Sequence, residues 1–238
     1  MCNLYSKTTN VEAMRRLFKV GKVDSSAANL PSQPSIFPAY DGPVIRLHEG
    51  ERELSMMHWG FILPQNDKSP KVVKNARDDK VRTSNFWKSS FEQRRCLIPA
   101  TSFAEYHPTH KDEKGHKTVV WFSLKGDEPR PPFTFAGIWR SWRGNYKDEL
   151  REMNLYSMLT TTPNELVKPI HPTRMPVILN PDDYEQWLSG SPDEAVKLLQ
   201  PFPPDLMRIA LEGGKTDEGA AVTTASLTAN SHFQSAVT

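Results

Sequence analysis

Short β-favouring runs separated by proline-rich segments constrain the fold of this chain more than any other feature. The chain has 20 prolines against 12 glycines, so many connections are stiff turns and loops. The runs are VIRL (44–47), ELSMMHWGFIL (53–63), RCLIPATSFAEY (95–106), TVVWFSL (118–124), FTFAGIW (133–139), NLYSMLTTT (154–162), MPVIL (175–179) and LMRIAL (206–211). They predict a chain in which strands dominate and helices are insertions.

Four such helices are expected from start and stop signals. The first follows Thr9 and Asn10 and has one apolar face, formed by Val11, Met14, Leu17 and Phe18. Ser84 caps the second, over 85–93; the third begins near Pro181 and ends before Gly190, and the fourth runs from Pro192 to about Gln200.

Length and composition favour one globular domain with a tail. The 238 residues are 37% hydrophobic and 24% charged, which is near the globular range. After residue 212 the chain is small, polar and aperiodic, so we expect a domain at 1–212 and a flexible tail at 213–238. No apolar run is long enough for a membrane span, and the start lacks the layout of a secretory signal, so we expect a cytoplasmic, nucleoid-associated protein.

The two cysteines suggest chemistry rather than a disulfide. Cys2 and Cys96 are far apart in the sequence, and Cys96 lies in an apolar run typical of a core. Removal of Met1 would place a free α-amine and a thiol together on Cys2, and such an amine adds to aldehydes. The neighbouring thiol can then close a five-membered ring on the imine. The alternative is that Cys2 is an ordinary residue near a chain end.

Motifs for familiar cofactors and metals are missing from the sequence. It has no glycine-rich phosphate loop, no G-x-S-x-G, no H-E-x-x-H and no deaminase signature, so we expect no cofactor. His107, His110 and His116 lie near Glu105 in a hydrophilic loop, and we interpret them as solvated histidines rather than metal ligands.

Positive charge is concentrated in one part of the chain. The net charge is only +2, but Lys68 to Arg95 holds nine Lys or Arg against three acids. This run is either a phosphate-facing surface or a solvated basic face with no partner.

Read together, Cys2 and four blocks resemble the SOS-response-associated peptidase (SRAP) family over roughly residues 1–211. The blocks are KNARDD (74–79), RCLIPATSFAEY (95–106), FAGIW (135–139) and TTTPNELVKPIHPTRMPVIL (160–179). The resemblance implies a single α+β domain built around a curved, mostly antiparallel, barrel-like sheet with a few helices. It also implies covalent capture of abasic sites in single-stranded DNA, protecting the lesion during the DNA damage response.

The resemblance implies roles for residues at matching positions. Cys2 would form the crosslink, first as a Schiff base and then as a thiazolidine. Glu105, at the end of an apolar strand, would be the general acid/base, and His171 would protonate the sugar ring oxygen. Asn75 would orient the sugar hydroxyl or the N-terminus without competing for protons.

Two arginines are the expected DNA-binding residues. Arg77 would contact phosphate, and Arg174 matches the arginine of the family's H-x-R-M-P block, although this chain has one residue more between His171 and Arg174.

The chain departs from the family pattern at several positions. Asn3 and Leu4 stand where the family commonly has Gly and Arg, and Asp79 stands where many members have Glu. No tryptophan directly follows the tract WGFILP (59–64), so base stacking beside the lesion has no obvious provider, and Trp59 itself reads as core.

Two other functions remain open. Cys2 could serve a cysteine peptidase that cleaves behind its own Met1, with Glu105 or His171 as base. Alternatively, the protein could be a non-covalent single-stranded DNA-binding module. For each we expect a monomer.

Overall fold

The computed structural model describes residues 2–65, 68–126 and 130–217. Its centre is a closed ring of five strands: β4 (Asp41–His48), β5 (Glu51–Trp59), β9 (Arg95–Ala100), β12 (Phe133–Tyr146) and β13 (Glu149–Thr161). All neighbours in the ring are antiparallel except β5 and β13, which run parallel and close it. Strand direction cannot alternate all the way round an odd ring, so one parallel contact is required.

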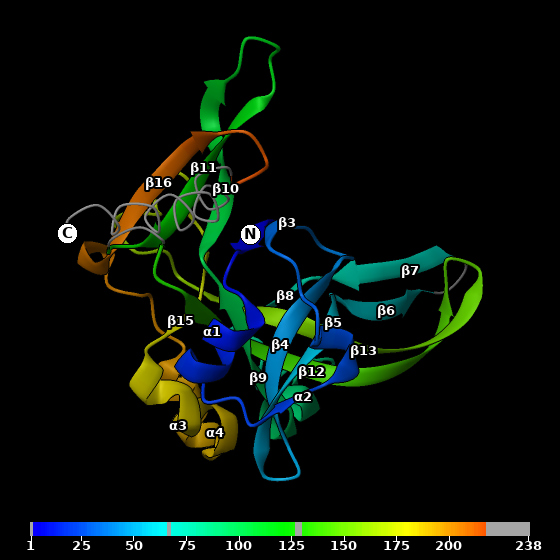
Figure 1. Ribbon diagram of the computed structural model, residues 1–238. Helices are drawn as coiled ribbons and strands as arrows, with labels where there is room; N and C mark the ends of the chain where they lie inside the picture. The colour runs from blue at the N-terminus through cyan, green and yellow to red at the C-terminus, as the bar shows by residue number, and fades with distance from the viewer. Residues whose placement is uncertain (1, 66–67, 127–129, 218–238) are drawn as a thin grey trace, which may run out of the picture.

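A five-stranded antiparallel sheet adjoins this ring. Its order is β16 (Met207–Gly213), β11 (Lys117–Leu124), β10 (Ser102–Lys111), β1 (Tyr5–Lys7) and β3 (Gln33–Ile36). Figure 1 shows the β10–β11 hairpin projecting from one end of the molecule and the β12–β13 hairpin projecting from the side, with β6 and β7 along it. The prediction of a curved, mostly antiparallel α+β domain with a few helices is confirmed.

The remaining elements are short and lie around the two sheets. The small strands are β2 (Lys22–Val23), β6 (Phe61–Gln65), β7 (Lys68–Val73), β8 (Asn75–Arg77), β14 (Met175–Pro176) and β15 (Ile178–Leu179). The α-helices are α1 (Val11–Leu17), α2 (Lys88–Gln93), α3 (Tyr184–Ser189) and α4 (Pro192–Ala195), and single 3₁₀ turns occur at Ser25–Ala27, Pro181–Asp183, Val196–Leu198 and Pro204–Leu206. In the described part of the chain, no helix has the length and apolar character needed to cross a bilayer.

Helix α1 confirms the predicted start but corrects the predicted face. The Asn10 side chain accepts a hydrogen bond from the Ala13 N–H at 2.8 Å, as an N-cap does. Met14 and Phe18 are buried, whereas Leu17 is 52% exposed. Leu17 is about 100° away from Phe18 around the helix, so the two cannot both face the core squarely.

The other helices begin as predicted with one exception. The third is a 3₁₀ turn from Pro181 leading into α3 with Gly190 as its C-cap, and Ser191 forms a capping box before the fourth. Helix α2 begins at Lys88, later than the predicted cap at Ser84. The Ser84 carbonyl nevertheless accepts the N–H groups of Trp87 and Lys88, so a turn precedes the helix there.

Two apolar runs that read as single strands are broken in the fold. The run 53–63 divides at Gly60, whose φ is +120° and where a Cβ would lie 2.3 Å from Val72 Cγ1. The run 95–106 divides at Thr101 into β9 of the ring and β10 of the other sheet. One continuous sequence signal therefore connects the two sheets.

Alternate residues of the ring strands face two different cores. Ile45, Leu97 and Leu155 pack in a cluster with residues of α1, α2 and α3. Their neighbours Val44, Cys96 and Tyr156 pack in a second cluster that includes residues of β1, β10 and β11. Burial on both faces explains why these strands are continuously apolar in the sequence.

The chain beyond β16 crosses the five-stranded sheet before the described residues end. Asp217 is buried, pairs with Arg130 and accepts a hydrogen bond from the Ser102 hydroxyl. Its N–H donates to the Pro34 carbonyl at 3.1 Å. Most of the tail predicted at 213–238 lies outside the described residues.

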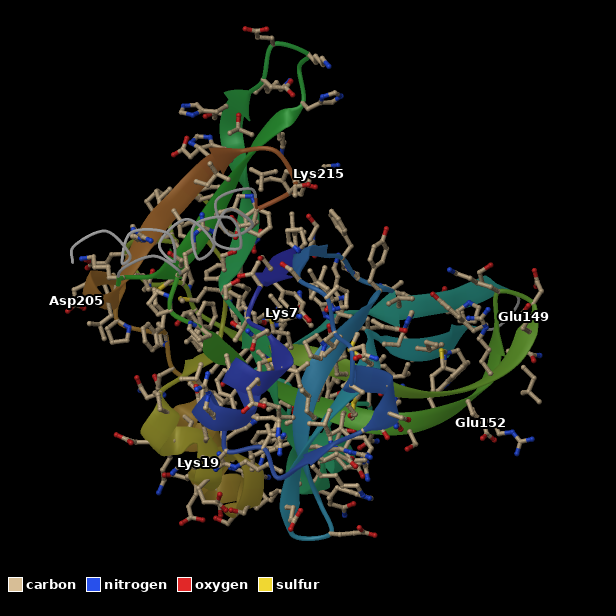
Figure 2. All side chains as sticks on the ribbon, viewed as in Figure 1. Lys7, Lys19, Glu149, Glu152, Asp205 and Lys215 are labelled. Atoms are coloured by element: carbon tan, nitrogen blue, oxygen red, sulfur yellow. The ribbon has the colours of Figure 1, made fainter. Side chains whose placement is uncertain are left out.

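Lys7 of β1 is a buried lysine that makes the stability of the fold depend on pH. Its side chain is fully buried and Nζ donates to the Pro31 carbonyl at 2.7 Å. Burial lowers the pKa of Lys7 to about 8. Figure 2 shows Lys7 within the body of the protein and Lys19 at its edge.

We expect the free energy of unfolding to rise as pH increases from about 8 to about 10.5. The unfolded chain holds the Lys7 proton over this range and the folded chain does not, which is worth about 3 kcal/mol at most. The free energy of unfolding is measured with urea at pH 7.5 and at pH 10. It should rise between these values in the parent and in the exposed control Lys19→Met, and this rise should be absent in Lys7→Met. Equal pH dependence in the parent and Lys7→Met would contradict the assignment.

Candidate active site

The start of the chain is held in the interior as part of a sheet. Strand β1 lies between β3 and β10, with Tyr5 opposite Phe103 and Ser6 opposite Ser102. The register continues toward the N-terminus, because the Leu4 carbonyl accepts the Ala104 N–H at 2.9 Å. Glu105, the next residue of β10, is therefore carried toward the first residues of the chain.

Cys2 is completely buried, and its position is fixed by two hydrogen bonds. Its thiol donates to the Leu4 carbonyl at 3.4 Å, and its carbonyl accepts the Nδ2 group of Asn75 at 2.8 Å. Burial, reinforced by the negative charge of Glu105, raises the pKa of the Cys2 thiol to about 12. The thiol is therefore protonated at neutral pH and needs a base before it can react.

Asn75 is positioned by strand β8, which runs parallel to β13 with Asn75 opposite Met158. The residue before it is anchored by its backbone: the Lys74 carbonyl accepts the Trp59 indole N–H at 2.9 Å and the Ser157 hydroxyl at 3.0 Å. Asn75 is 6% exposed, and its buried Oδ1 accepts no hydrogen bond from the described residues. This oxygen can accept a hydrogen bond from a reactant beside Cys2.

Glu105 is a buried carboxyl group with an acid/base function available near neutral pH. It is 5% exposed, and burial raises its pKa to about 7. The positive charge of Lys74 acts in the opposite direction and is also among the influences on the Cys2 thiol. At pH 7 both protonation states of Glu105 are populated, as a group that gives and takes protons requires.

His171 lies in a loop that packs on the same core cluster as Cys2. Val167 and Met175 belong to that cluster, and the His171 N–H donates to the Val167 carbonyl at 2.8 Å. Burial lowers the pKa of His171. Its Nδ1 accepts the Arg174 backbone N–H at 3.2 Å, so the neutral ring carries its proton on Nε2.

The structure brings four of the predicted residues to one region. Cys2 contacts Asn75, and the charge of Glu105 acts on the Cys2 thiol. His171 lies in the loop between Val167 and Met175, both of which pack in the same apolar cluster as Cys2. The region therefore combines a thiol, a carboxyl group, an imidazole and a carboxamide at the start of the chain.

The two predicted arginines are placed differently from each other. Arg77 is exposed at the end of β8, and its guanidinium makes two hydrogen bonds to Asp79, at 2.9 and 2.6 Å. Arg174 is 9% exposed, and its Nη2 contacts Asp78 Oδ1 at 2.6 Å and the Thr160 carbonyl at 2.9 Å. Arg77 faces solvent, whereas Arg174 joins its loop to the segment that follows β8.

Sequence reasoning missed two residues at this site. Lys74 was counted only as one charge in the basic run, although its place directly before Asn75 was a usable signal. Asp78 was not given a role, yet it pairs with Arg174 and accepts the Thr161 hydroxyl at 2.7 Å. Nothing in the local sequence indicates that Asp78 meets a residue 96 positions away.

The histidines of the β10–β11 hairpin lie apart from this region. The rings of His107 and His110 stack at 3.6 Å between centroids; His110 is exposed and His107 is half-buried. Among residues 2–65, 68–126 and 130–217, no three His, Cys, Asp or Glu side chains gather as metal ligands would.

Comparison with known proteins gives consistent relatives. A family model described as SOS response associated peptidase (SRAP) matches residues 1–211. Abasic site processing protein YoaM from Bacillus subtilis is 31% identical over 197 residues, covering 81% of this chain and 79% of that protein. Abasic site processing protein YoqW from the same organism is 28% identical over 212 residues, covering 87% and 90%.

Solved structures share the fold. A protein from Bordetella bronchiseptica matches with a TM-score of 0.68 at 23% identity, over 89% of this chain and 98% of that one. A protein from Bacteroides thetaiotaomicron matches with a TM-score of 0.68 at 24% identity, over 87% and 90%. Since the family model spans almost the whole described chain, this protein belongs to the SOS response associated peptidase family.

Proposed function

We propose that this protein processes abasic sites in single-stranded DNA by forming a covalent bond through Cys2. The observation that carries the proposal is the burial of Cys2 beside a carboxyl group whose pKa is about 7. The names of its relatives, which are abasic site processing proteins, support the same substrate. In this proposal the protein acts as a monomer in the cytoplasm and needs no cofactor.

The reaction begins with the amine, after Met1 has been removed. The α-amine of Cys2 adds to the open-chain aldehyde of the abasic sugar, and loss of water gives an imine. The thiol then adds to the imine carbon, and its proton ends on the nitrogen, which closes a thiazolidine ring. A thiol with a pKa of about 12 cannot lead the attack, so the amine acts first.

Glu105 and His171 move the protons in this sequence. Protonated Glu105 donates to the hydroxyl group that leaves as water, and the resulting carboxylate takes the proton of the Cys2 thiol. Neutral His171 donates a hydrogen bond from Nε2 to the sugar ring oxygen as the ring opens, and this oxygen receives the proton that the anomeric hydroxyl loses. Asn75 holds the Cys2 carbonyl, and its Oδ1 is available to the amine or to a sugar hydroxyl.

The arginines divide the work of binding. Exposed Arg77 contacts a phosphate, and to do so it must give up its ion pair with Asp79. Arg174, neutralised by Asp78, braces the segment that carries Asn75 and Arg77 and keeps His171 in place through its backbone N–H.

The direct test is covalent capture. Single-stranded DNA containing uracil and treated with a uracil glycosylase should give a heat-stable, gel-shifted product with the parent. Cys2→Ala and Cys2→Ser should give none, although both should yield an imine that borohydride traps, because they keep the amine. Cys96→Ala, which removes the other thiol, is the matched control and should retain the product. Intact mass must confirm that Cys2 is the free N-terminus, and a parent in that state that forms no product would refute the proposal.

The buried Glu105 carboxyl group should decrease the stability of the folded protein near and above pH 7, where it loses its proton. The folded carboxyl holds its proton up to a pH of about 7 and the unfolded one only to about 4.5, so stability falls as pH rises between these values. At pH 8 the free energy of unfolding of Glu105→Gln, measured with urea, should therefore exceed that of the parent by up to about 3 kcal/mol. Near pH 4.5 the two proteins should be equally stable. The rate of product formation by Glu105→Gln should fall by about 100-fold or more. The exposed control Glu113→Gln should change neither property, and a destabilised Glu105→Gln at pH 8 would contradict the buried, high-pKa carboxyl.

Asp79 should compete with DNA for Arg77. We expect Asp79→Asn to bind an unmodified single strand several-fold more tightly at low salt, measured by fluorescence anisotropy, and the gain to shrink as salt increases. The gain should vanish in Arg77→Ala/Asp79→Asn. Asp193→Asn frees Arg82 from another surface pair and changes net charge by the same amount, so it controls for charge alone. An equal gain in Asp193→Asn would show that the competition is not specific.

A further inference from the structure

An exposed tyrosine stands where the β3–β4 connection passes the active site. Tyr40 is 57% exposed. In the described part of the chain, the other large aromatic side chain of comparable exposure is Tyr106, at 37%. Tyr106 follows Glu105 on β10, and because alternate side chains of a strand point to opposite faces, it faces away from the buried carboxyl.

Tyr40 is joined to the active site through Phe37. The two rings meet edge to face, with centroids 5.7 Å apart. Phe37 in turn packs on the small cluster that contains Leu4 and Ala104. These are the residues that carry Cys2 and Glu105 toward each other, and Figure 1 shows β3, which precedes Phe37, beside the amino-terminal end of the chain.

A second connection runs through the backbone and Trp59. The Trp59 N–H donates to the Tyr40 carbonyl at 2.9 Å, and the Trp59 carbonyl accepts the Ala39 N–H at 2.9 Å. Trp59 is fully buried, and its indole N–H donates to the carbonyl of Lys74, the residue before Asn75. The backbone that bears the Tyr40 ring is therefore fixed relative to the groups that hold Cys2, while the ring itself is open to solvent.

We propose that Tyr40, supported by Phe37, is a stacking platform for the nucleobase next to the abasic site. This inference rests on the proposed function, since it assumes a DNA strand across the active site. An abasic nucleotide offers no base to stack on, so its neighbours lose a stacking partner at the lesion. A rigid aromatic ring at the rim of the site replaces that partner for any base, because every base has a π-face. Buried Trp59 cannot do this, and Tyr40 supplies the aromatic contact that the sequence after Trp59 lacks.

The test is a double-mutant cycle in which the Tyr40 ring and the flanking base are removed separately and together. End-labelled single strands carry a central tetrahydrofuran, which has no aldehyde and cannot form a covalent bond, and either normal flanking bases or a second tetrahydrofuran in place of one flanking base. The Kd of each is measured by anisotropy. For the parent, loss of one of the two flanking bases should weaken binding about tenfold, the scale of one base stacked on an aromatic ring.

The variants decide the assignment. Tyr40→Ala should bind the normal strand about tenfold more weakly and lose nothing further when the flanking base is removed. Tyr40→Phe and Tyr40→Trp should behave like the parent, as should Tyr106→Ala. The inference is overturned if removal of the flanking base weakens the binding of Tyr40→Ala by the same factor as that of the parent. It is also overturned if the parent does not bind these strands.

The two proposals fail separately. Covalent capture is measured on aldehyde-containing DNA and stacking on tetrahydrofuran DNA. A parent that shows the stacking cycle without a covalent product would refute the proposed reaction and keep the platform. A parent that forms the covalent product on aldehyde-containing DNA, but whose Kd for tetrahydrofuran DNA does not change when the flanking base is removed, would keep the reaction and remove the platform.

Discussion

The insertion of the amino-terminal strand between β3 and β10 is the constraint on which the rest of the site depends. Chain ends ordinarily fray, because few contacts hold them. Here Tyr5 and Ser6 pair with β10, the Leu4 carbonyl is bonded to Ala104, and the Cys2 carbonyl is bonded to Asn75. In the proposed reaction the amine and thiol of Cys2 need this rigidity, because a mobile terminus would not keep them beside a particular carboxyl group.

Burial that raises the pKa values of Glu105 and Cys2 also costs stability. Removing Glu105 from water raises its pKa into the useful range, and the same surroundings keep the Cys2 thiol protonated. Lys7, three residues beyond Leu4, is buried on a single carbonyl acceptor in the same strand. The first strand therefore combines tight β pairing with charged groups that water would otherwise solvate, and the two apolar clusters of the ring must offset that cost.

A polar network on the other side of the site positions the residues that follow β7. Asp78 joins Arg174 to the Thr161 hydroxyl, and the Lys74 carbonyl collects donors from Trp59 and Ser157. Each bond links a residue of the 74–79 segment to the barrel or to the His171 loop. The 74–79 segment thus has two parts: an exposed Arg77, to which the proposal assigns a phosphate, and backbone and acidic groups that hold the segment in place.

The sequence by itself determined the strand-rich class and the helix starts at Asn10, Pro181 and Pro192, because periodicity and caps are local signals. Its motif blocks also predicted Cys2, Asn75, Glu105 and His171 as candidate reactive residues. Only the tertiary structure decided that the run 95–106 splits between two sheets, that β12 and β13 extend through polar residues to a turn at Lys147 and Asp148, and that Arg174 pairs with Asp78 while Arg77 stays exposed. These features depend on pairings between residues far apart in the chain, and a polar strand or a distant ion pair is stabilised by its partner rather than by its own sequence.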